Sequence, residues 1–115
     1  MLFESQYNEL FLAVDTLAER LRALGEKAPA SFTEFKKLAT VSDGDSSLDE
    51  NRMVRDLYIA NQQVGHLVKK AIAIGEKADD VSTVDLLTQR VTAHDKAAWM
   101  LKSALPKEER LKLAS

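Results

Sequence analysis

Apolar residues recur along this chain at steps of three and four positions, the spacing that places side chains on one face of an α-helix. Three long segments carry the pattern, and no segment alternates apolar and polar residues as a half-buried strand would. A large apolar side chain on such a face gains about 1.5–3 kcal/mol when it is buried. The pattern therefore predicts an all-α fold, an antiparallel helical bundle. The predicted faces are Phe3, Tyr7, Leu10, Val14, Leu17, Leu21 and Leu24; Met53, Leu57, Ala60, Val64, Leu67, Ala71 and Ile74; and Val84, Leu87, Val91, His94, Ala98, Leu101 and Leu105.

Capping residues predict where the first helices begin and end. Gly25 supplies a left-handed cap after the first long segment. Ser31 and Glu34 have capping-box spacing, which predicts a short helix beginning at this point. Ser47 and Glu50 have the same spacing and are predicted to open the second long helix.

The last two long helices are predicted to be antiparallel neighbours. The apolar face of the second continues until Gly75, and the connection of residues 76–80 is short. Asp80 or Ser82 is expected to cap the third helix, and Pro106 stops it.

Composition fits one soluble domain. Of the 115 residues, 45% are hydrophobic and 30% charged, and the absence of cysteine excludes disulfides and thiolate-bound metals. No apolar run approaches the roughly 20 residues of a membrane span, and no signal peptide opens the chain, so we expect a cytoplasmic location and no membrane partner. We expect a single domain over residues 1–115, with three long helices, one short helix between the first two, and a C-terminal tail at 106–115.

Two carboxylates one helical turn apart stand out in the first segment. Asp15 and Glu19 share a helix face, where like charges repel by a few tenths of a kcal/mol. A bound cation would convert this repulsion into attraction, because hard metals take oxygen ligands. The alternative is a solvated face on which Glu19 pairs with Arg22.

The two histidines are interpreted as structural. His94 lies on the predicted apolar face of the third helix, where a core or interface histidine satisfied by a polar neighbour is expected rather than a metal ligand. His66 follows Gly65 on the second long helix and has no acidic partner at ligand spacing, so we interpret it in the same way.

Three stretches together resemble one known family, the ferritin-like Dps proteins, miniferritins that protect DNA during starvation. Phe3-Glu-Ser-Gln-Tyr7 leading into Val14-Asp-Thr-Leu-Ala-Glu-Arg-Leu-Arg22 resembles the family's second helix. Leu24-Gly25 followed by Pro29-Ala-Ser-Phe-Thr-Glu-Phe35 resembles its short helix, and Asp85-Leu-Leu-Thr-Gln-Arg90 followed by His94-Asp-Lys-Ala-Ala-Trp-Met-Leu101 resembles its last helix. The resemblance covers essentially the whole chain and implies a ferritin-like bundle that lacks the first helix. The first predicted helix also begins in phase at Met1 without a cap, which favours a fragment of a longer protein over a complete three-helix protein.

The resemblance also implies a function. Members of this family assemble into twelve-subunit cages and oxidise ferrous iron at sites shared across a dimer interface. By resemblance, Asp15 and Glu19 occupy carboxylate positions that bind iron (Fe²⁺/Fe³⁺), and Glu4 matches a further ligand position used in some members. The remaining ligands are histidines on the first helix and at the start of the second, so half of the site is present here. The implied activity is that of a ferroxidase, an oxidoreductase that stores iron and limits peroxide damage.

Oligomerisation is expected on two grounds. A bundle without one helix exposes an apolar stripe that a second copy would cover, giving at least a dimer, and the resemblance implies a dodecameric cage. Asp79, Asp80 and Asp85 are either favourable negative charges at a helix N-terminus or, by resemblance, the lining of three-fold pores through which iron enters. The alternative function is a non-catalytic helical oligomerisation module.

Tight DNA binding is not expected. The formal net charge is −2, and the basic residues Lys107, Arg110 and Lys112 near the C-terminus are interrupted by Glu108 and Glu109. So few basic residues give only weak, salt-sensitive contact with phosphates.

Overall fold

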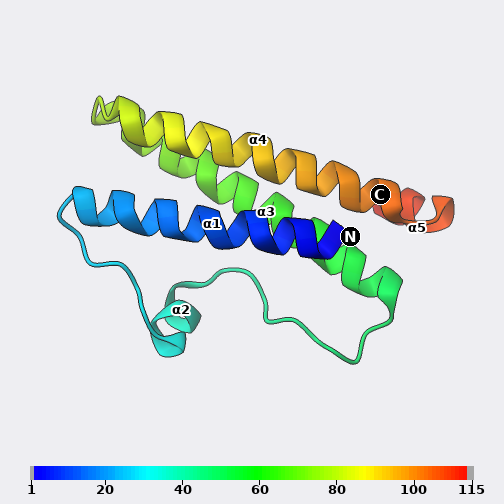
Figure 1. The fold of residues 1–115 in the computed structure, drawn as a ribbon. Helices are drawn as coiled ribbons and strands as arrows, with labels where there is room; N and C mark the ends of the chain where they lie inside the picture. Colours follow the sequence, from blue (N-terminus) through cyan, green and yellow to red (C-terminus); the bar gives the residue numbers. More distant parts are fainter. Residues whose placement is uncertain (1, 114–115) are drawn as a thin grey trace. The chain divides into compact units, whose positions relative to one another are not determined.

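The computed structural model describes residues 2–113, and within this range all regular secondary structure is helical. The helices are α1 (Leu2–Ala23), α2 (Phe32–Leu38), α3 (Glu50–Lys77), α4 (Val81–Ala104) and α5 (Lys107–Leu113) (Figure 1). They fall into two compact units, Met1–Thr40 with α1 and α2, and Val41–Ser115 with α3, α4 and α5. The predicted all-α fold is confirmed, with three long helices and a short one between the first two.

The capping residues predicted for the first unit are confirmed. Gly25 has a φ of 90°, and its N–H donates to Arg22 O while the N–H of Glu26 donates to Leu21 O, both at 3.0 Å. This pair of hydrogen bonds is a Schellman motif, which satisfies carbonyls left free at the end of α1.

The short helix α2 begins with a capping box. Ser31 Oγ accepts from the N–H of Glu34 at 3.2 Å, and Glu34 Oε2 accepts from the N–H of Ala30 at 2.7 Å. Ser31 thereby satisfies a donor that the first turn of the helix leaves free. Glu34 reaches the N–H of Ala30, one residue before the N-cap, in place of the N-cap N–H of a standard capping box.

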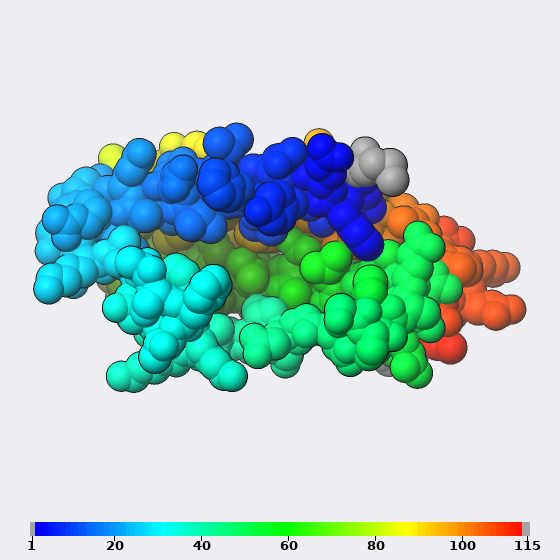
Figure 2. Space-filling model, turned by 60° about the horizontal axis from the view of Figure 1, so that its bottom comes forward, coloured from blue at the N-terminus to red at the C-terminus, as the bar shows by residue number. Residues whose placement is uncertain are grey.

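Helix α1 presents an uncovered apolar face. No residue of α1 is buried, and Tyr7 and Val14 of its predicted face are 68% and 60% exposed. Figure 2 shows the side chains of α1 (blue) as one continuous row along the helix. The amphipathic pattern predicted for this segment is therefore present without a covering element of its own unit.

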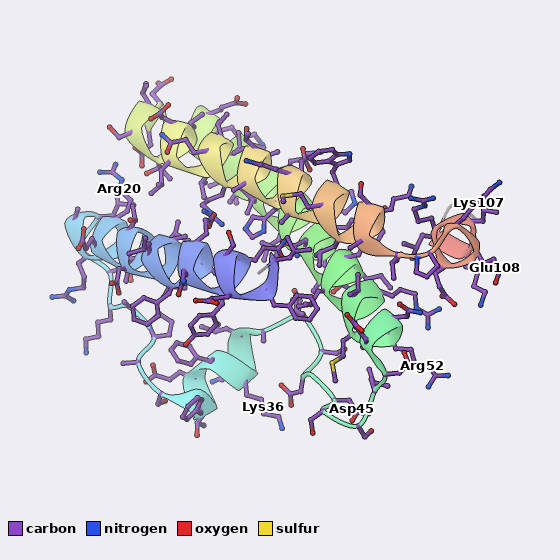
Figure 3. All side chains as sticks on the ribbon, turned by 45° about the vertical axis from the view of Figure 1, so that its right-hand side comes forward. Arg20, Lys36, Asp45, Arg52, Lys107 and Glu108 are labelled. Carbon is purple, nitrogen blue, oxygen red and sulfur yellow. The ribbon has the colours of Figure 1, made fainter. Side chains whose placement is uncertain are left out.

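The start of α3 differs from the prediction. Ser47 does not cap this helix, because its hydroxyl and its N–H both donate to Asp45 Oδ1, at 2.6 and 2.9 Å. The helix begins two residues later, where Asp49 Oδ1 accepts from the N–H of Arg52 at 2.9 Å. Figure 3 shows Asp45 in the loop that leads into α3 and Arg52 in its first turn. The capping-box prediction for Ser47 and Glu50 was wrong because an Asx turn uses the serine first.

The end of α3 also lies beyond the predicted residue. Gly75 remains inside the helix, which continues to Lys77. Asp79 takes the left-handed conformation instead, with a φ of 55°, and its N–H donates to Glu76 O at 3.1 Å while that of Asp80 donates to Gly75 O at 2.9 Å. An aspartate therefore occupies the Schellman position that glycine usually takes.

Helices α3 and α4 form an antiparallel pair that contains the small core of their unit (Figure 1). The buried residues of α4 match the predicted face: His94, Ala98 and Leu101, with Leu105 directly after the helix. Leu101 is completely inaccessible to solvent, with 0% of its surface exposed.

On α3, by contrast, the buried stripe lies one residue further along than predicted, about 100° around the helix. Its buried residues are Val54, Asn61, Gly65 and Gly75, whereas the large predicted residues Leu57, Leu67 and Ile74 are exposed. Half-buried Tyr58, Val68 and Ile72 lie on the same stripe as buried Val54, so α3 carries two adjacent faces with helical apolar spacing, and periodicity alone did not decide which of them is buried.

The tail of the chain forms a separate helix. Helix α4 ends at Ala104, and Pro106 prevents its continuation, as predicted. Residues 107–113 form the helix α5, where the sequence pattern predicted only a C-terminal tail. A single domain over all 115 residues stays a prediction, because two compact units can belong to one domain.

Candidate metal site

Asp15 and Glu19 lie one turn apart on α1, and both are exposed. Four residues of α-helix rise about 6 Å, so one ion could lie between the two carboxylates. Neither carboxylate has a hydrogen-bond or ion-pair partner among residues 2–113. The guanidinium of Arg22 donates to the backbone carbonyl of Glu26 at 3.3 Å, and among the described residues it forms no ion pair with Glu19. The exposure of both side chains agrees with the alternative of a solvated helix face, although the pairing of Glu19 with Arg22 that it included is not formed among the described residues. The choice between a metal site and a solvated face stays a prediction.

Glu4 is exposed on the same helix, eleven residues before Asp15. At 100° per residue this spacing brings the two side chains to within about 20° of the same face, but about 16 Å apart along the axis. One ion cannot contact both residues of a single copy. If Glu4 binds metal, it belongs to a different site from Asp15 and Glu19 of the same chain.

The carboxylate pair is an incomplete site by itself. Among residues 2–113, no group of three or more histidine, cysteine, aspartate or glutamate side chains is placed to hold a metal ion. Two carboxylates fit the oxygen ligands that iron accepts, but they leave most of its coordination positions open. Further ligands would have to come from outside this part of the chain.

The acidic residues at the start of α4 have individual structural roles. Asp80 caps α4: its Oδ1 accepts from the N–H of Thr83 at 3.1 Å and its Oδ2 from the Thr83 hydroxyl at 2.5 Å. Asp79 forms the left-handed turn before the helix, and Asp85 accepts from Gln89 Nε2 at 3.2 Å. Negative charge in this position stabilises a helix N-terminus whether or not a pore exists.

A buried polar cluster links α3 and α4, and it contains residues that the sequence analysis missed. His94 is 6% exposed and Asn61 is 9% exposed. His94 Nδ1 lies 2.9 Å from Asn61 Oδ1, and His94 Nε2 lies 3.1 Å from a guanidinium nitrogen of Arg90. The interpretation of His94 as a structural histidine with a polar partner is confirmed. The sequence signal for Asn61 is its position at helical spacing from the apolar residues Val54, Tyr58 and Val68.

The other histidine does not lie in the core of its unit, and acidic residues lie among the basic ones near the C-terminus. His66 is exposed on α3. On α5, Lys107 and Glu108 are neighbours (Figure 3), and Lys112 Nζ lies 3.3 Å from Glu109 Oε1. Acidic side chains thus interrupt the basic ones on this helix, as the sequence pattern predicted.

Comparison with known proteins identifies the family. The ferritin-like domain family matches residues 1–111. DNA protection during starvation protein 2 of Bacillus anthracis is 30% identical over 103 residues, which are 90% of this chain and 70% of the relative. General stress protein 20U of Bacillus subtilis is 31% identical over 103 residues, covering 90% of this chain and 71% of the relative. The chain belongs to the Dps family.

Solved Dps structures share the same fold. Dps from Thermosynechococcus elongatus superposes with a TM-score of 0.88 at 32% identity, covering 92% of this chain and 68% of that one. Dps from Staphylococcus aureus gives a TM-score of 0.86 at 32% identity, covering 90% of this chain and 70% of that one. Dps from Vibrio cholerae, described as a member of a superfamily of ferritin-like diiron-carboxylate proteins, gives a TM-score of 0.84 at 26% identity, covering 88% of this chain and 64% of that one. The match to the Dps fold therefore spans both units of the chain. No described helix is both long enough and apolar enough to cross a membrane.

Proposed function

We propose that this Dps-family chain binds ferrous iron and takes part in its oxidation and storage, and that it thereby limits peroxide damage. The observation that carries the proposal is the exposed pair Asp15 and Glu19, whose two negative charges lie one turn apart with no neutralising partner among residues 2–113. A cation between them would remove a repulsion that the helix otherwise retains. The names of the relatives support a role in DNA protection and stress response, and we place this role in the cytoplasm.

In this proposal Asp15 and Glu19 supply oxygen ligands from one chain, and imidazole ligands from another protomer complete the site. Ferrous iron is the substrate, and dioxygen or peroxide accepts its electrons. The carboxylates hold the ion and offset its charge in both oxidation states, since hard oxygen ligands suit Fe³⁺ as well as Fe²⁺. Glu4, about 16 Å away along α1, would belong to a second site, separate from the one to which Asp15 and Glu19 of the same chain contribute.

The uncovered apolar face of α1 supports assembly with further copies, at least as a dimer, and we extend the proposal to a dodecameric cage. Phe3, Tyr7, Leu10 and Val14 are large, apolar and exposed along this one helix, and contiguous apolar surface of this kind is a common mark of an interface. If the cage forms, Asp79, Asp80 and Asp85 of three copies could line an entry path for cations.

Iron titration tests the metal-binding proposal. In anaerobic calorimetry with Fe²⁺, Asp15→Asn combined with Glu19→Gln is expected to weaken binding at least about tenfold. In a separate assay with dioxygen or peroxide supplied, the same variant is expected to oxidise Fe²⁺ no faster than buffer does. The matched control is Asp56→Asn combined with Glu76→Gln, which makes the same chemical changes at exposed α3 positions that are too far apart to share an ion. Equal binding by the unmodified chain and the Asp15/Glu19 variant would refute the proposal.

The alternative is an oligomerisation module without chemistry, which the apolar face of α1 also supports. Sedimentation separates assembly from iron chemistry: a stable oligomer that binds no iron would favour the module, and a stable monomer at micromolar concentration would contradict both. Under either function we expect no tight DNA binding. A gel shift with nanomolar affinity at physiological salt would refute this expectation.

A further inference from the structure

The cluster that joins α3 to α4 is a chain of hydrogen bonds with only one possible direction. It begins at the backbone carbonyl of Leu57, which can only accept, and Asn61 Nδ2 donates to it at 2.8 Å. The amide nitrogen of Asn61 is thus committed, so its Oδ1 faces His94 and accepts from Nδ1 at 2.9 Å. The proton of the neutral imidazole therefore lies on Nδ1.

The other end of the chain requires the same tautomer. A guanidinium has five N–H donors and no acceptor, so the contact of 3.1 Å between Arg90 and His94 Nε2 is a hydrogen bond only if Nε2 carries no proton. Each group accepts from the next, and reversing any one bond would place donor against donor or acceptor against acceptor. The contacts of the ring with Asn61 and with Arg90 are both hydrogen bonds only while His94 is neutral.

We propose that His94 is a proton-sensitive lock between α3 and α4: the two helices are held in their observed register while the imidazole is neutral, and its protonation in mild acid releases them. Protonation turns Nε2 into a donor, so the bond from Arg90 is lost whatever else the guanidinium contacts. Within the unit of α3, α4 and α5, α4 presents the charged Arg90 to the ring, and α3 presents the neutral Asn61 amide, itself bonded to the Leu57 carbonyl. A positive charge on a ring that is 6% exposed is also far less well hydrated than in the unfolded chain.

The sign of the pH dependence follows from this geometry. In the unfolded chain, His94 takes up a proton below about pH 6.5, whereas the folded chain resists protonation. Unfolding therefore binds a proton, so the stabilisation is complete above that pH and is lost as the pH falls below it. The unfolding constant should rise by up to tenfold per pH unit, which is the limit for one proton.

Two measurements test the proposal. The free energy of unfolding, measured in urea between pH 7.5 and 5, is expected to fall much less with pH in His94→Gln than in the unmodified chain. Glutamine offers a carbonyl to Arg90 and does not titrate. His66→Gln, which changes the chain's other histidine at an exposed α3 position, should leave the sensitivity intact. If His94→Gln retains the acid sensitivity, or if His66→Gln removes it, the lock does not exist.

Nitrogen NMR of the unmodified chain gives an answer even if His94→Gln fails to fold. The two ring systems are assigned by the loss of one in His66→Gln. The His94 ring is expected to carry its proton on Nδ1 and to remain neutral in the folded chain well below the usual range near pH 6.5. A His94 ring that is protonated on Nε2 at neutral pH, or that gains its second proton at or above pH 6.5 while α3 and α4 stay packed, would overturn the proposal.

Discussion

Two glycines on α3 give opposite predictions for the same substitution. A Cβ added at Gly75 would lie 2.9 Å from Val84 Cγ2 on α4, whereas a Cβ at Gly65 would have no heavy atom beyond its own local helix backbone within 4 Å. Alanine in a helix interior is favoured over glycine by about 1 kcal/mol. We therefore expect Gly65→Ala to stabilise the protein by roughly this amount.

At Gly75 the same gain is opposed by overpacking. Ordinary carbon contacts lie at about 3.5–4 Å, so Val84 or the helices must move by more than 0.5 Å or so. The Val84 methyl cannot simply turn away, because a β-branched side chain in a helix has one strongly preferred rotamer. Overpacking of this kind costs about 1–3 kcal/mol. The net expectation for Gly75→Ala is between neutral and about 2 kcal/mol destabilising.

Urea unfolding followed by circular dichroism measures both variants, with an unchanged slope required for the comparison. Val84→Ala removes the methyl group that a Cβ at Gly75 would overlap. In the Val84→Ala background Gly75→Ala should therefore stabilise by up to about 1 kcal/mol, because the higher helix propensity of alanine is no longer opposed by overpacking. If Gly75→Ala stabilises as much as Gly65→Ala while Val84 is present, the close approach of α3 and α4 at this point is refuted.

Three further predictions concern local features. Asp80→Ala should cost about 1 kcal/mol by removing the cap on α4, whereas Asp80→Asn keeps the cap and should lower the melting temperature less, because it removes only the negative charge at the helix N-terminus. Asp79→Gly should stabilise by up to about 1 kcal/mol in urea unfolding, because glycine adopts the left-handed φ of 55° without strain. The hydrogen bonds from the Ser47 hydroxyl and then from its N–H hold the pKa of Asp45 below its usual value. Any contribution of this carboxylate to stability is therefore present at neutral pH and lost in strong acid. In Ser47→Ala an NMR titration should find the pKa of Asp45 raised, and an unchanged pKa would contradict this cause.

Interactions between residues close in sequence were predictable from the sequence. The caps at Gly25, Ser31 and Asp80 are confirmed, because each depends on groups at most five residues apart. The error at Ser47 shows the limit of such rules, since Asp45 and Asp49 offered competing local bonds of similar geometry. The Asp15 and Glu19 pair was also found from spacing, and its role as a metal site stays a prediction.

The periodicity of the sequence determined that this chain is helical and where most of its helices lie, because those properties depend on neighbours within a turn or two. Only the tertiary structure decided which face of α3 is buried and how α3 meets α4. The contacts that settle this join Asn61 to His94, 33 positions apart, and bring Gly75 against Val84. Asn61 and Gly75 are polar or small and give no signal in a pattern of large apolar side chains, whereas Val84 and His94 belong to the predicted face of α4. Which positions of α3 that face meets appears only when the two helices lie side by side.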